Sequence, residues 1–89
     1  MNKKRERLEI IKDILFAIKN KRQIKPTRLL YSSNLSPQMF KQYIGLLLKK
    51  KFIEEIFFKK KKFFSLTTKG RDFLEEYKVI DSLIKNFGL

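Results

Sequence analysis

Hydrophobic residues near the start of the chain recur at intervals of three and four positions. This spacing joins Leu8, Ile11, Leu15 and Ile18. Residues three or four positions apart share one face of an α-helix, so the pattern is typical of an amphipathic helix with charged residues on its other face. We therefore predict a helix from Lys3 to Asn20 and then a loop over residues 20–23, where no large hydrophobic residue occurs.

Two further helices are predicted in the next segment. Pro26 suits the first turn of a helix, and residues 27–32 carry enough apolar side chains to form a short one. The third helix has a clearer start, because Ser36 can accept backbone hydrogen bonds as the N-cap and Pro37 fits the first helical position. These signals predict that the third helix begins at Pro37.

The third helix has an apolar and a polar face. We expect its apolar positions to face the first two helices, and they are Phe40, Tyr43, Ile44, Leu47 and Leu48. The opposite face carries Gln38, Lys41, Gln42, Gly45 and Lys49. None of these residues is acidic, so this face suits a negatively charged partner.

A β-hairpin is predicted after the third helix. Two short strands rich in isoleucine and phenylalanine span residues 52–58 and 63–66. Lys59 to Lys62 lie between them, and four consecutive lysines repel one another and require water or a polyanion. The pattern therefore predicts a hairpin with a solvated basic tip, which is a candidate wing.

The hairpin also contains two adjacent pairs of aromatic residues, namely Phe57, Phe58, Phe63 and Phe64. Exposed aromatic rings can stack on the bases of single-stranded nucleic acid. Core packing is the better interpretation, because a small domain needs its aromatic residues inside. Since neighbouring residues of a strand point to opposite faces, one member of each pair can still be exposed or lie at an interface.

The chain ends with a long predicted helix, from Thr68 to about Phe87, that Thr67 can cap and Gly88 can terminate. Apolar residues recur along it at alternating steps of four and three, the spacing of a coiled-coil seam. The seam residues are Phe73, Tyr77, Ile80, Ile84 and Phe87. Leu74 and Leu83 widen the apolar face, which indicates that one side packs on the domain and another meets a different partner.

The predicted order of helix, helix, helix, strand, strand, helix is that of a winged helix-turn-helix domain, a mostly α-helical fold with a small β-hairpin (α+β). A resemblance to the small archaeal winged helix-turn-helix proteins, which are DNA-binding or similar to transcriptional regulators, is carried by two segments, L-S-P-Q-M-F-K-Q-Y-I-G-L-L-L-K-K-K-F-I-E-E (35–55) and F-F-S-L-T-T-K-G-R-D-F-L (63–74). It implies that double-stranded DNA is the partner, with the third helix in the major groove and the wing beside it.

Some members of that family form homodimers in which the last helices pair as an antiparallel coiled coil. The resemblance therefore implies a homodimer through the seam, with residues 1–66 as the winged helix-turn-helix domain and residues 67–89 as the dimerisation helix of the same domain. The seam spans only about two heptads, so the sequence leaves parallel and antiparallel pairing open. One departure is Lys51, where such proteins usually have a glycine in a left-handed conformation, so that Lys51 is mildly strained or the turn differs.

The distribution of charge supports a nucleic-acid partner independently. Lys and Arg number 22 against 9 Asp and Glu, which gives a net charge of +13. Residues 14–53 contain nine basic residues and residues 56–71 six more, with no acid in either segment, whereas acids outnumber bases over residues 72–89. Such a charge distribution attracts polyanions. The alternative is that the lysines only form a solvated surface, favoured by genome composition or by adaptation to heat.

Candidate DNA contacts follow from these positions. On the third helix, Gln38, Lys41 and Gln42 can reach base edges, and Gly45 allows the backbone to approach closely. Phosphate contacts are expected at the helix starts and on the wing, from Lys25, Thr27, Arg28, Tyr31, Ser36, Lys59, Lys60, Lys61 and Lys62. Because 17 of the 22 basic residues are lysines, which lack the bidentate fork of arginine, we expect phosphate contacts to dominate over sequence readout.

Several functions are excluded or disfavoured. The sequence has no Cys and no His, which excludes disulfides, zinc fingers and Cys or His nucleophiles. The adjacent carboxylates at residues 54–55 and 75–76 do not converge on a site, so we expect no enzyme activity, no metal and no cofactor. The longest strictly apolar run, residues 14–18, is too short to span a bilayer, and acids near the N-terminus do not fit a signal peptide. We expect a cytoplasmic, nucleoid-associated protein.

Alternatives are left open by the sequence. The DNA role divides into a transcriptional regulator and a nucleoid-associated protein that bends or bridges DNA. A winged helix also serves as a protein-interaction module in larger assemblies, in which case Tyr77, Ile80 and Phe87 would bind a different chain. The basic first helix could instead lie on an anionic membrane, although its apolar stripe is needed for the core.

Overall fold

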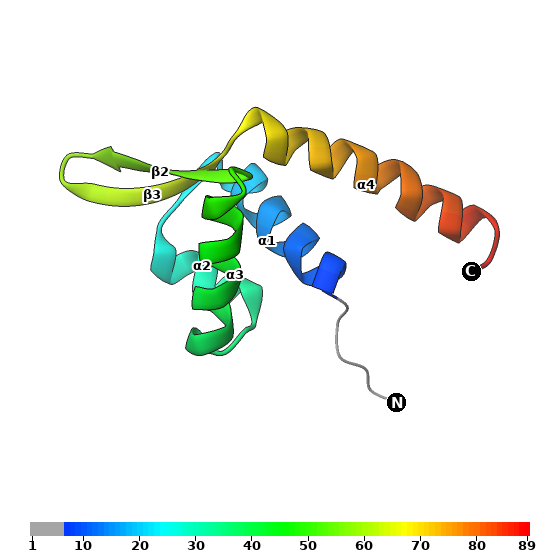
Figure 1. Ribbon diagram of the computed structural model, residues 1–89, viewed down its shortest axis with the longest axis horizontal. Coiled ribbons are helices and arrows are strands. Elements are labelled where there is room, and N and C mark those ends of the chain that lie inside the picture. Colours follow the sequence, from blue (N-terminus) through cyan, green and yellow to red (C-terminus); the bar gives the residue numbers. More distant parts are fainter. Residues whose placement is uncertain (1–6) are drawn as a thin grey trace.

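The computed structural model describes residues 7–89, and this part of the chain forms four helices and a three-stranded antiparallel sheet (Figure 1). The elements are α1 (Arg7–Lys21), β1 (Gln23–Ile24), α2 (Pro26–Ser33), α3 (Pro37–Lys49), β2 (Ile53–Phe58), β3 (Lys61–Leu66) and α4 (Thr68–Asn86). The predicted mostly helical fold, with three helices, a hairpin and a long last helix, is confirmed. The predicted helix start at Lys3 lies outside the described residues.

A short strand replaces part of the loop that the sequence predicts after the first helix. Gln23 and Ile24 pair antiparallel with Ser65 and Phe64, so β1 forms one edge of the sheet, β2 the other, and β3 lies between them. The prediction of a loop through Gln23 was therefore wrong. A two-residue strand is too short to show an alternating pattern, and its pairing depends on a partner strand that comes much later in the chain.

The β2–β3 hairpin, hereafter the wing, has a tighter turn than the four-lysine tip that the sequence predicts. Only Lys59 and Lys60 form the turn, with φ angles of 51° and 64°, whereas Lys61 and Lys62 belong to β3 and pair with Phe58 and Phe57. Two-residue turns with both central residues at positive φ match the right-handed twist of paired strands. This preference for a two-residue connection extends the ladder into the lysine run.

The hydrophobic core is built around α1. Its residues Ile14, Leu15 and Ile18 are completely buried, in agreement with the predicted apolar stripe. The same cluster contains residues of the other elements, among them Leu29, Ile44, Leu47, Ile53, Phe64, Leu66 and Leu74. Leu8, which the stripe also includes, lies in the first turn of α1 and is 58 % exposed.

Local signals determine where several helices begin and end. Ser36 Oγ accepts a hydrogen bond from the backbone N–H of Met39 at 3.2 Å, which confirms the predicted N-cap of α3. Thr67 Oγ1 accepts one from Gly70 N at 3.1 Å and caps α4 in the same way. Beyond the other end of α4, Gly88 has a φ of 72°, as expected of a glycine that terminates a helix.

The end of α3 is joined to the start of α4 by a set of hydrogen bonds. Lys51 has a φ of 67°, and its N–H and that of Phe52 donate to Leu48 O and Leu47 O at 3.1 and 2.9 Å. This is the bonding pattern of a Schellman motif, with Lys51 at the position that glycine usually occupies. The Thr67 hydroxyl donates to Lys51 O at 2.6 Å. The wing and α4 therefore leave the end of α3 in a defined geometry.

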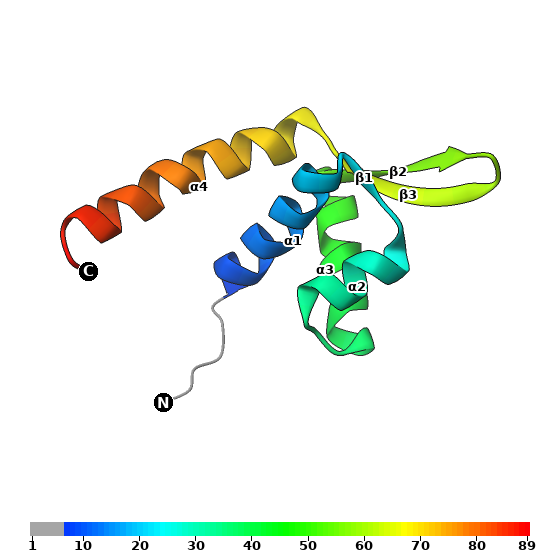
Figure 2. The same ribbon diagram turned by 180° about the vertical axis from the view of Figure 1, so that it is seen from behind.

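The two ends of the molecule have different characters. The wing extends away from the helices on one side, and the second half of α4 extends on the opposite side (Figures 1 and 2). The first half of α4 packs on the domain, with Leu74 buried in the core and the Phe73 ring against that of Phe52 at 5.7 Å between centroids. These projections give the molecule extents of 48 × 29 × 21 Å.

Candidate nucleic-acid interface

The outer face of α3 is open to solvent over the positions that the sequence predicts to read DNA. Gln38, Lys41, Gln42 and Gly45 are all exposed, and a Cβ built at Gly45 meets no other atom within 4 Å. Internal packing therefore does not require a glycine at this position. Ser36 is exposed as well, and since its oxygen already accepts the N-cap hydrogen bond, its hydroxyl proton is left to donate to a phosphate.

The predicted phosphate ligands of the second helix also lie on the surface. Lys25, Thr27, Arg28 and Tyr31 are exposed, and the phenol ring of Tyr31 is 78 % exposed. Lys25 stands at the N-cap of α2, where no side chain caps the helix. The free backbone N–H groups of such a helix start add a positive potential to that of the lysine.

The wing lysines are not equivalent, in contrast to the uniform basic tip that the sequence predicts. Lys59 and Lys60 lie at the turn, and the ammonium of Lys59 lies 5.4 Å from the centre of the Phe58 ring. Lys62 forms an ion pair with Glu55 at 3.2 Å. The charge of Lys62 is therefore partly neutralised, and the strongest positive field of the wing comes from residues 59–61.

The aromatic residues of the wing are more exposed than core packing requires. Phe64 is 3 % exposed and belongs to the core, and Phe63 is half-buried. Phe57 and Phe58, however, are 68 % and 59 % exposed, so both members of this pair are exposed where the sequence predicts one at most. The reason is the length of the hairpin, because β1 pairs only with residues 64 and 65 of β3 and leaves the outer part of the wing without a third strand.

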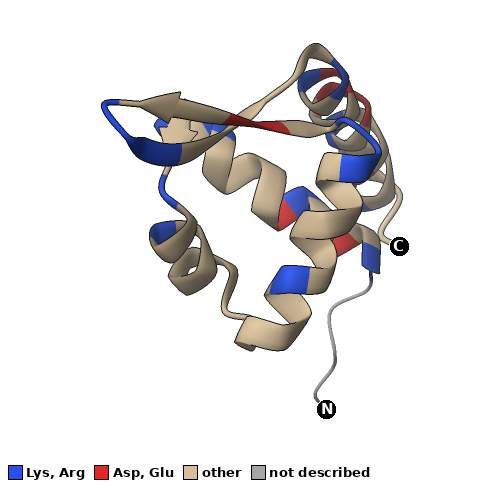
Figure 3. Ribbon diagram, turned by 60° about the vertical axis from the view of Figure 1, so that its left-hand side comes forward, with Lys and Arg blue, Asp and Glu red and all other residues tan. Residues whose placement is uncertain are grey.

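Basic residues dominate the surface formed by α2, α3 and the wing. Figure 3 shows lysine and arginine on these three elements, with the acidic stretch of β2 between the wing tip and the end of α3. α2 and α3 contain no acidic residue at all. Lys62 on β3 is paired with Glu55 on β2, whereas α2 and α3 have no carboxylate of their own to neutralise their basic residues.

The seam residues of α4 fall into two groups. Phe73 and Tyr77 are half-buried against their own domain, and Lys12 of α1 lies 5.7 Å from the centre of the Tyr77 ring. The hydrogen bond between Lys12 and Asp13 raises the pKa of Lys12 above its ordinary value, which favours the charged ammonium beside the ring. Ile80, Ile84 and Phe87 are 56 %, 41 % and 72 % exposed. The free part of the seam therefore begins at Ile80.

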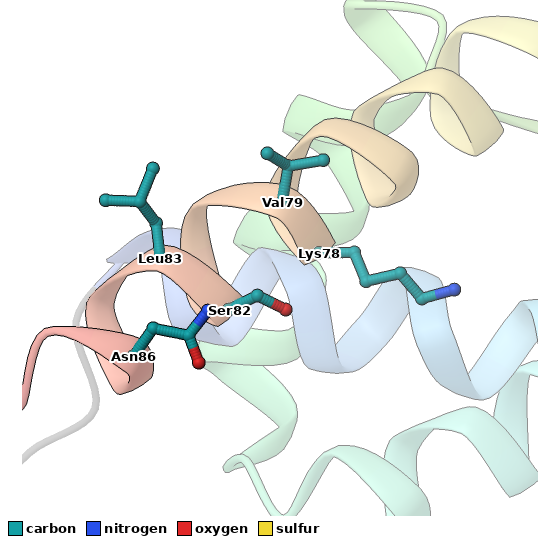
Figure 4. Close-up of a pocket in the computed structure, with 5 residues that line it drawn as sticks. All are labelled: Lys78, Val79, Ser82, Leu83 and Asn86. Atoms are coloured by element: carbon teal, nitrogen blue, oxygen red, sulfur yellow. The ribbon is translucent and has the colours of Figure 1, made fainter.

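A second exposed apolar strip lies next to this part of the seam. Val79 and Leu83 are 61 % and 52 % exposed and line an open hollow together with Lys78, Ser82 and Asn86 (Figure 4). The sequence places Leu83 at the margin of the seam, and the structure adds Val79. The second half of α4 thus exposes a broad apolar face.

Two other kinds of site concern residues 7–89, namely metal centres and membrane-spanning helices. No cluster of three or more Asp, Glu, His or Cys side chains there is arranged to hold a metal ion. None of the helices in this range is long and apolar enough to cross a membrane.

Residues 4–85 match the sequence profile described as winged helix-turn-helix. The chain belongs to this winged helix-turn-helix family. The resemblance found in the sequence is thereby confirmed. α3 has the position of the helix that helix-turn-helix proteins place in the major groove, and it is hereafter called the recognition helix.

Two archaeal relatives extend the comparison. Both are uncharacterized proteins of Methanocaldococcus jannaschii. MJ0290 is 40 % identical over 81 residues, which cover 91 % of this winged helix-turn-helix chain and 36 % of the relative. MJ0287 is 41 % identical over 68 residues, which cover 76 % of this chain and 65 % of the relative. The chain thus spans about a third of the first relative and just under two thirds of the second.

Solved structures with 20 % sequence identity share the fold. Sso10a-2, a DNA-binding protein from Sulfolobus solfataricus, has a TM-score of 0.77 over 93 % of this winged helix-turn-helix chain and 85 % of its own. F93 from STIV, a winged-helix DNA-binding protein, has a TM-score of 0.69 over 86 % and 90 %. The oxidized form of MarR from E. coli has a TM-score of 0.68 over 85 % of this chain and 60 % of its own.

Proposed function

We propose that this protein binds double-stranded DNA as a homodimer and acts as a transcriptional regulator or a nucleoid-associated protein in the cytoplasm. The observation that carries the proposal is the surface of α2 and α3, which exposes basic and amide side chains and has no carboxylate. Two proteins of the same fold, Sso10a-2 and F93, are DNA-binding proteins, which supports the proposal.

In the proposed complex, α3 lies in the major groove. Gln38, Lys41 and Gln42 contact base edges, since an amide matches adenine and an ammonium matches guanine. At Gly45 the missing side chain lets the helix backbone approach the bases. Phosphate contacts come from Ser36, from the start of α2 and from the wing. They supply most of the affinity because the neutralisation of phosphates releases condensed counterions, and this contribution is not sequence-specific. The proposal includes no catalytic step.

The proposed dimer contact is the second half of α4. Its exposed apolar residues Ile80, Ile84 and Phe87 would be removed from water by pairing with the same helix of a second copy. Residues 67–89 would then act as the dimerisation element beside a DNA-binding unit of residues 1–66. Because the wing and the end of α4 lie on opposite sides of the molecule, a dimer through α4 leaves both wings pointing outward (Figure 1). Two linked binding units raise the overall affinity through effective concentration.

Fluorescence anisotropy of two unrelated labelled duplexes, titrated at several salt concentrations, tests the DNA proposal. A steep salt dependence with equal affinity for both duplexes is the expected result, and it favours a nucleoid-associated protein. A difference between the duplexes favours a regulator. Mass-resolved size exclusion of the same sample tests the dimer. Absence of binding to both duplexes at low salt would refute the DNA proposal.

A protein-interaction module in a larger assembly is the second candidate. The observation that favours it is the broad apolar face of α4, where Val79 and Leu83 adjoin the seam. A stable dimer with no measurable affinity for either duplex would support this function in place of the first, because the basic surface would then serve another polyanion or a protein.

A further inference from the structure

The outer part of the wing carries two phenylalanines on opposite faces. Phe57 pairs across the hairpin with Lys62, and Phe58 pairs with Lys61. Successive side chains of a strand point to opposite faces, and directly paired residues of antiparallel strands point to the same one. Each face of the wing tip therefore presents one exposed aromatic ring beside one lysine.

The register identifies which face of the wing continues the buried face of the sheet. Ile53, Phe64 and Leu66 are buried in the core that the helices share with the sheet. Phe57 is separated from Ile53 by an even number of positions and so projects from this same face. Phe58 projects from the other face, away from the helices. Phe57 is therefore the exposed ring on the side of the wing where the helices lie.

The turn of the wing has lysines at two positions where the backbone conformation is unfavourable for them. Lys59 and Lys60 both have positive φ, a region in which asparagine and glycine are favoured. With Lys61 they place three cations around the two exposed rings, and Lys62 lies beside them in its ion pair with Glu55. This arrangement matches a partner that is both strongly anionic and able to accept an apolar side chain, as the grooves of duplex DNA are.

We propose that Phe57 inserts into a groove of double-stranded DNA as an apolar wedge, while the neighbouring lysines hold the phosphates on either side. This inference rests on the proposed DNA-binding function and adds a mode of binding to it. An inserted side chain that partly unstacks a base step bends the duplex. The contact of Phe57 is apolar, so its share of the affinity does not depend on salt, whereas that of the lysines does.

Phe57→Ala tests the wedge, and Phe58→Ala is the matched control, because it removes the same ring from the adjacent position on the other face. The dissociation constant for one duplex is measured over a salt series, and the bend is measured by energy transfer between dyes at the two ends. We expect Phe57→Ala to bind about tenfold more weakly with an unchanged salt slope, as for the loss of one aromatic contact to a base. The bend should decrease, and Phe58→Ala should behave as the wild type.

A fluorescence measurement gives a second, independent readout. The chain has no tryptophan, so Phe57→Trp and Phe58→Trp each introduce a single indole fluorophore that preserves an aromatic ring at the site. Stacking against bases quenches indole emission. Addition of duplex should therefore quench Phe57→Trp strongly and leave Phe58→Trp nearly unchanged.

Several results would overturn the wedge. One is wild-type affinity and bending in Phe57→Ala, and another is an equal loss in Phe58→Ala, because neither fits contact through one face. Loss of binding to phosphatidylglycerol vesicles in Phe57→Ala, with duplex binding intact, would assign the ring to a membrane surface instead. If the wild type itself binds no duplex, the proposed function fails along with the wedge, whereas the first two results leave that function standing.

Discussion

Gly70, in the first turn of α4, packs against the backbone of Phe52 so closely that a Cβ at position 70 would overlap the Phe52 carbonyl oxygen. The same oxygen accepts a hydrogen bond from the backbone N–H of Thr67 at 3.1 Å. A glycine is therefore required here by a close approach of two backbones and not by an unusual φ angle. The contact holds α4 against the segment that links the recognition helix to the wing.

Gly70→Ala should destabilise the fold. The added methyl group forces the start of α4 away from Phe52, and overpacking of this kind costs about 2 kcal/mol in the free energy of unfolding. Urea denaturation followed by circular dichroism measures the change. Gly45→Ala is the control, because position 45 is open and alanine is the better helix former, so this variant should gain up to about 1 kcal/mol. Equal stability of the two variants would contradict the close approach at Gly70.

Lys51→Gly should stabilise the protein. Lys51 has a φ of 67° at the C-terminal Schellman motif of α3, and a left-handed conformation costs a residue with a Cβ about 1 kcal/mol relative to glycine. The expected result is a higher urea midpoint with an unchanged slope. The neighbouring Lys50 has a φ of −87°, so Lys50→Gly should give no such gain. A lower midpoint for Lys51→Gly would show that the lysine side chain contributes more than the strain costs.

Positions with strong local signals could be predicted from the sequence. The N-cap at Ser36 and the cap at Thr67 depend on a residue and the backbone three positions later, and both are present. The family pattern also identified Lys51 as an exception, and its positive φ answers the question that the sequence left open. Helix caps and turns are determined by a few neighbouring residues, which is why the sequence alone can predict them.

Features that depend on distant partners could not be predicted in this way. The strand at Gln23–Ile24 exists because of Phe64 and Ser65, and nothing in its two residues indicates pairing. The exposure of both Phe57 and Phe58 could not be predicted for a related reason. Composition indicates that aromatic rings should be buried, but only the register and the short reach of β1 show that the outer wing has nothing to pack against. The candidate DNA contacts predicted from the sequence therefore do not include Phe57.

Charge reversal at Lys60 and Lys61 should weaken binding to all duplexes by a similar factor. These lysines are proposed to contact phosphates, and each phosphate contact that is lost lowers the salt slope by about one. Anisotropy titrations of two unrelated duplexes over a salt series measure both quantities. Lys85→Glu is a control with the same charge change per residue on α4, where Lys85 pairs with Asp81 at 3.3 Å, and it should affect binding much less than reversal of either wing lysine. If the affinity of the wing variant is unchanged, the wing does not take part in the interface with DNA.

Gln42→Ala separates a regulator from an architectural protein. Gln42 is exposed on the recognition helix, where its amide can form paired hydrogen bonds with adenine. If one duplex is preferred, loss of such a pair should reduce the preference by about 1–3 kcal/mol while affinity for the other duplex stays the same. For an architectural protein, the substitution should leave both affinities unchanged. A uniform loss on both duplexes would contradict base readout and would assign Gln42 to a backbone contact.

Ile84→Lys tests the proposed dimer without disturbing the fold. Ile84 is 41 % exposed in the second half of α4, so a lysine there remains solvated in a monomer but places a charge in the apolar contact of a dimer. Mass-resolved size exclusion should show a monomer. Thermal unfolding of this variant should be close to that of the dissociated wild type. Phe73→Ala is the contrasting variant, because the Phe73 ring packs on Phe52 of the same chain and its loss should lower stability more than it affects association.

The monomeric Ile84→Lys variant should also bind duplex more weakly, although the intrinsic affinity of each binding unit is unchanged, because the two units are no longer linked. A dimer that persists in Ile84→Lys would show that the dimer contact does not involve this part of the seam.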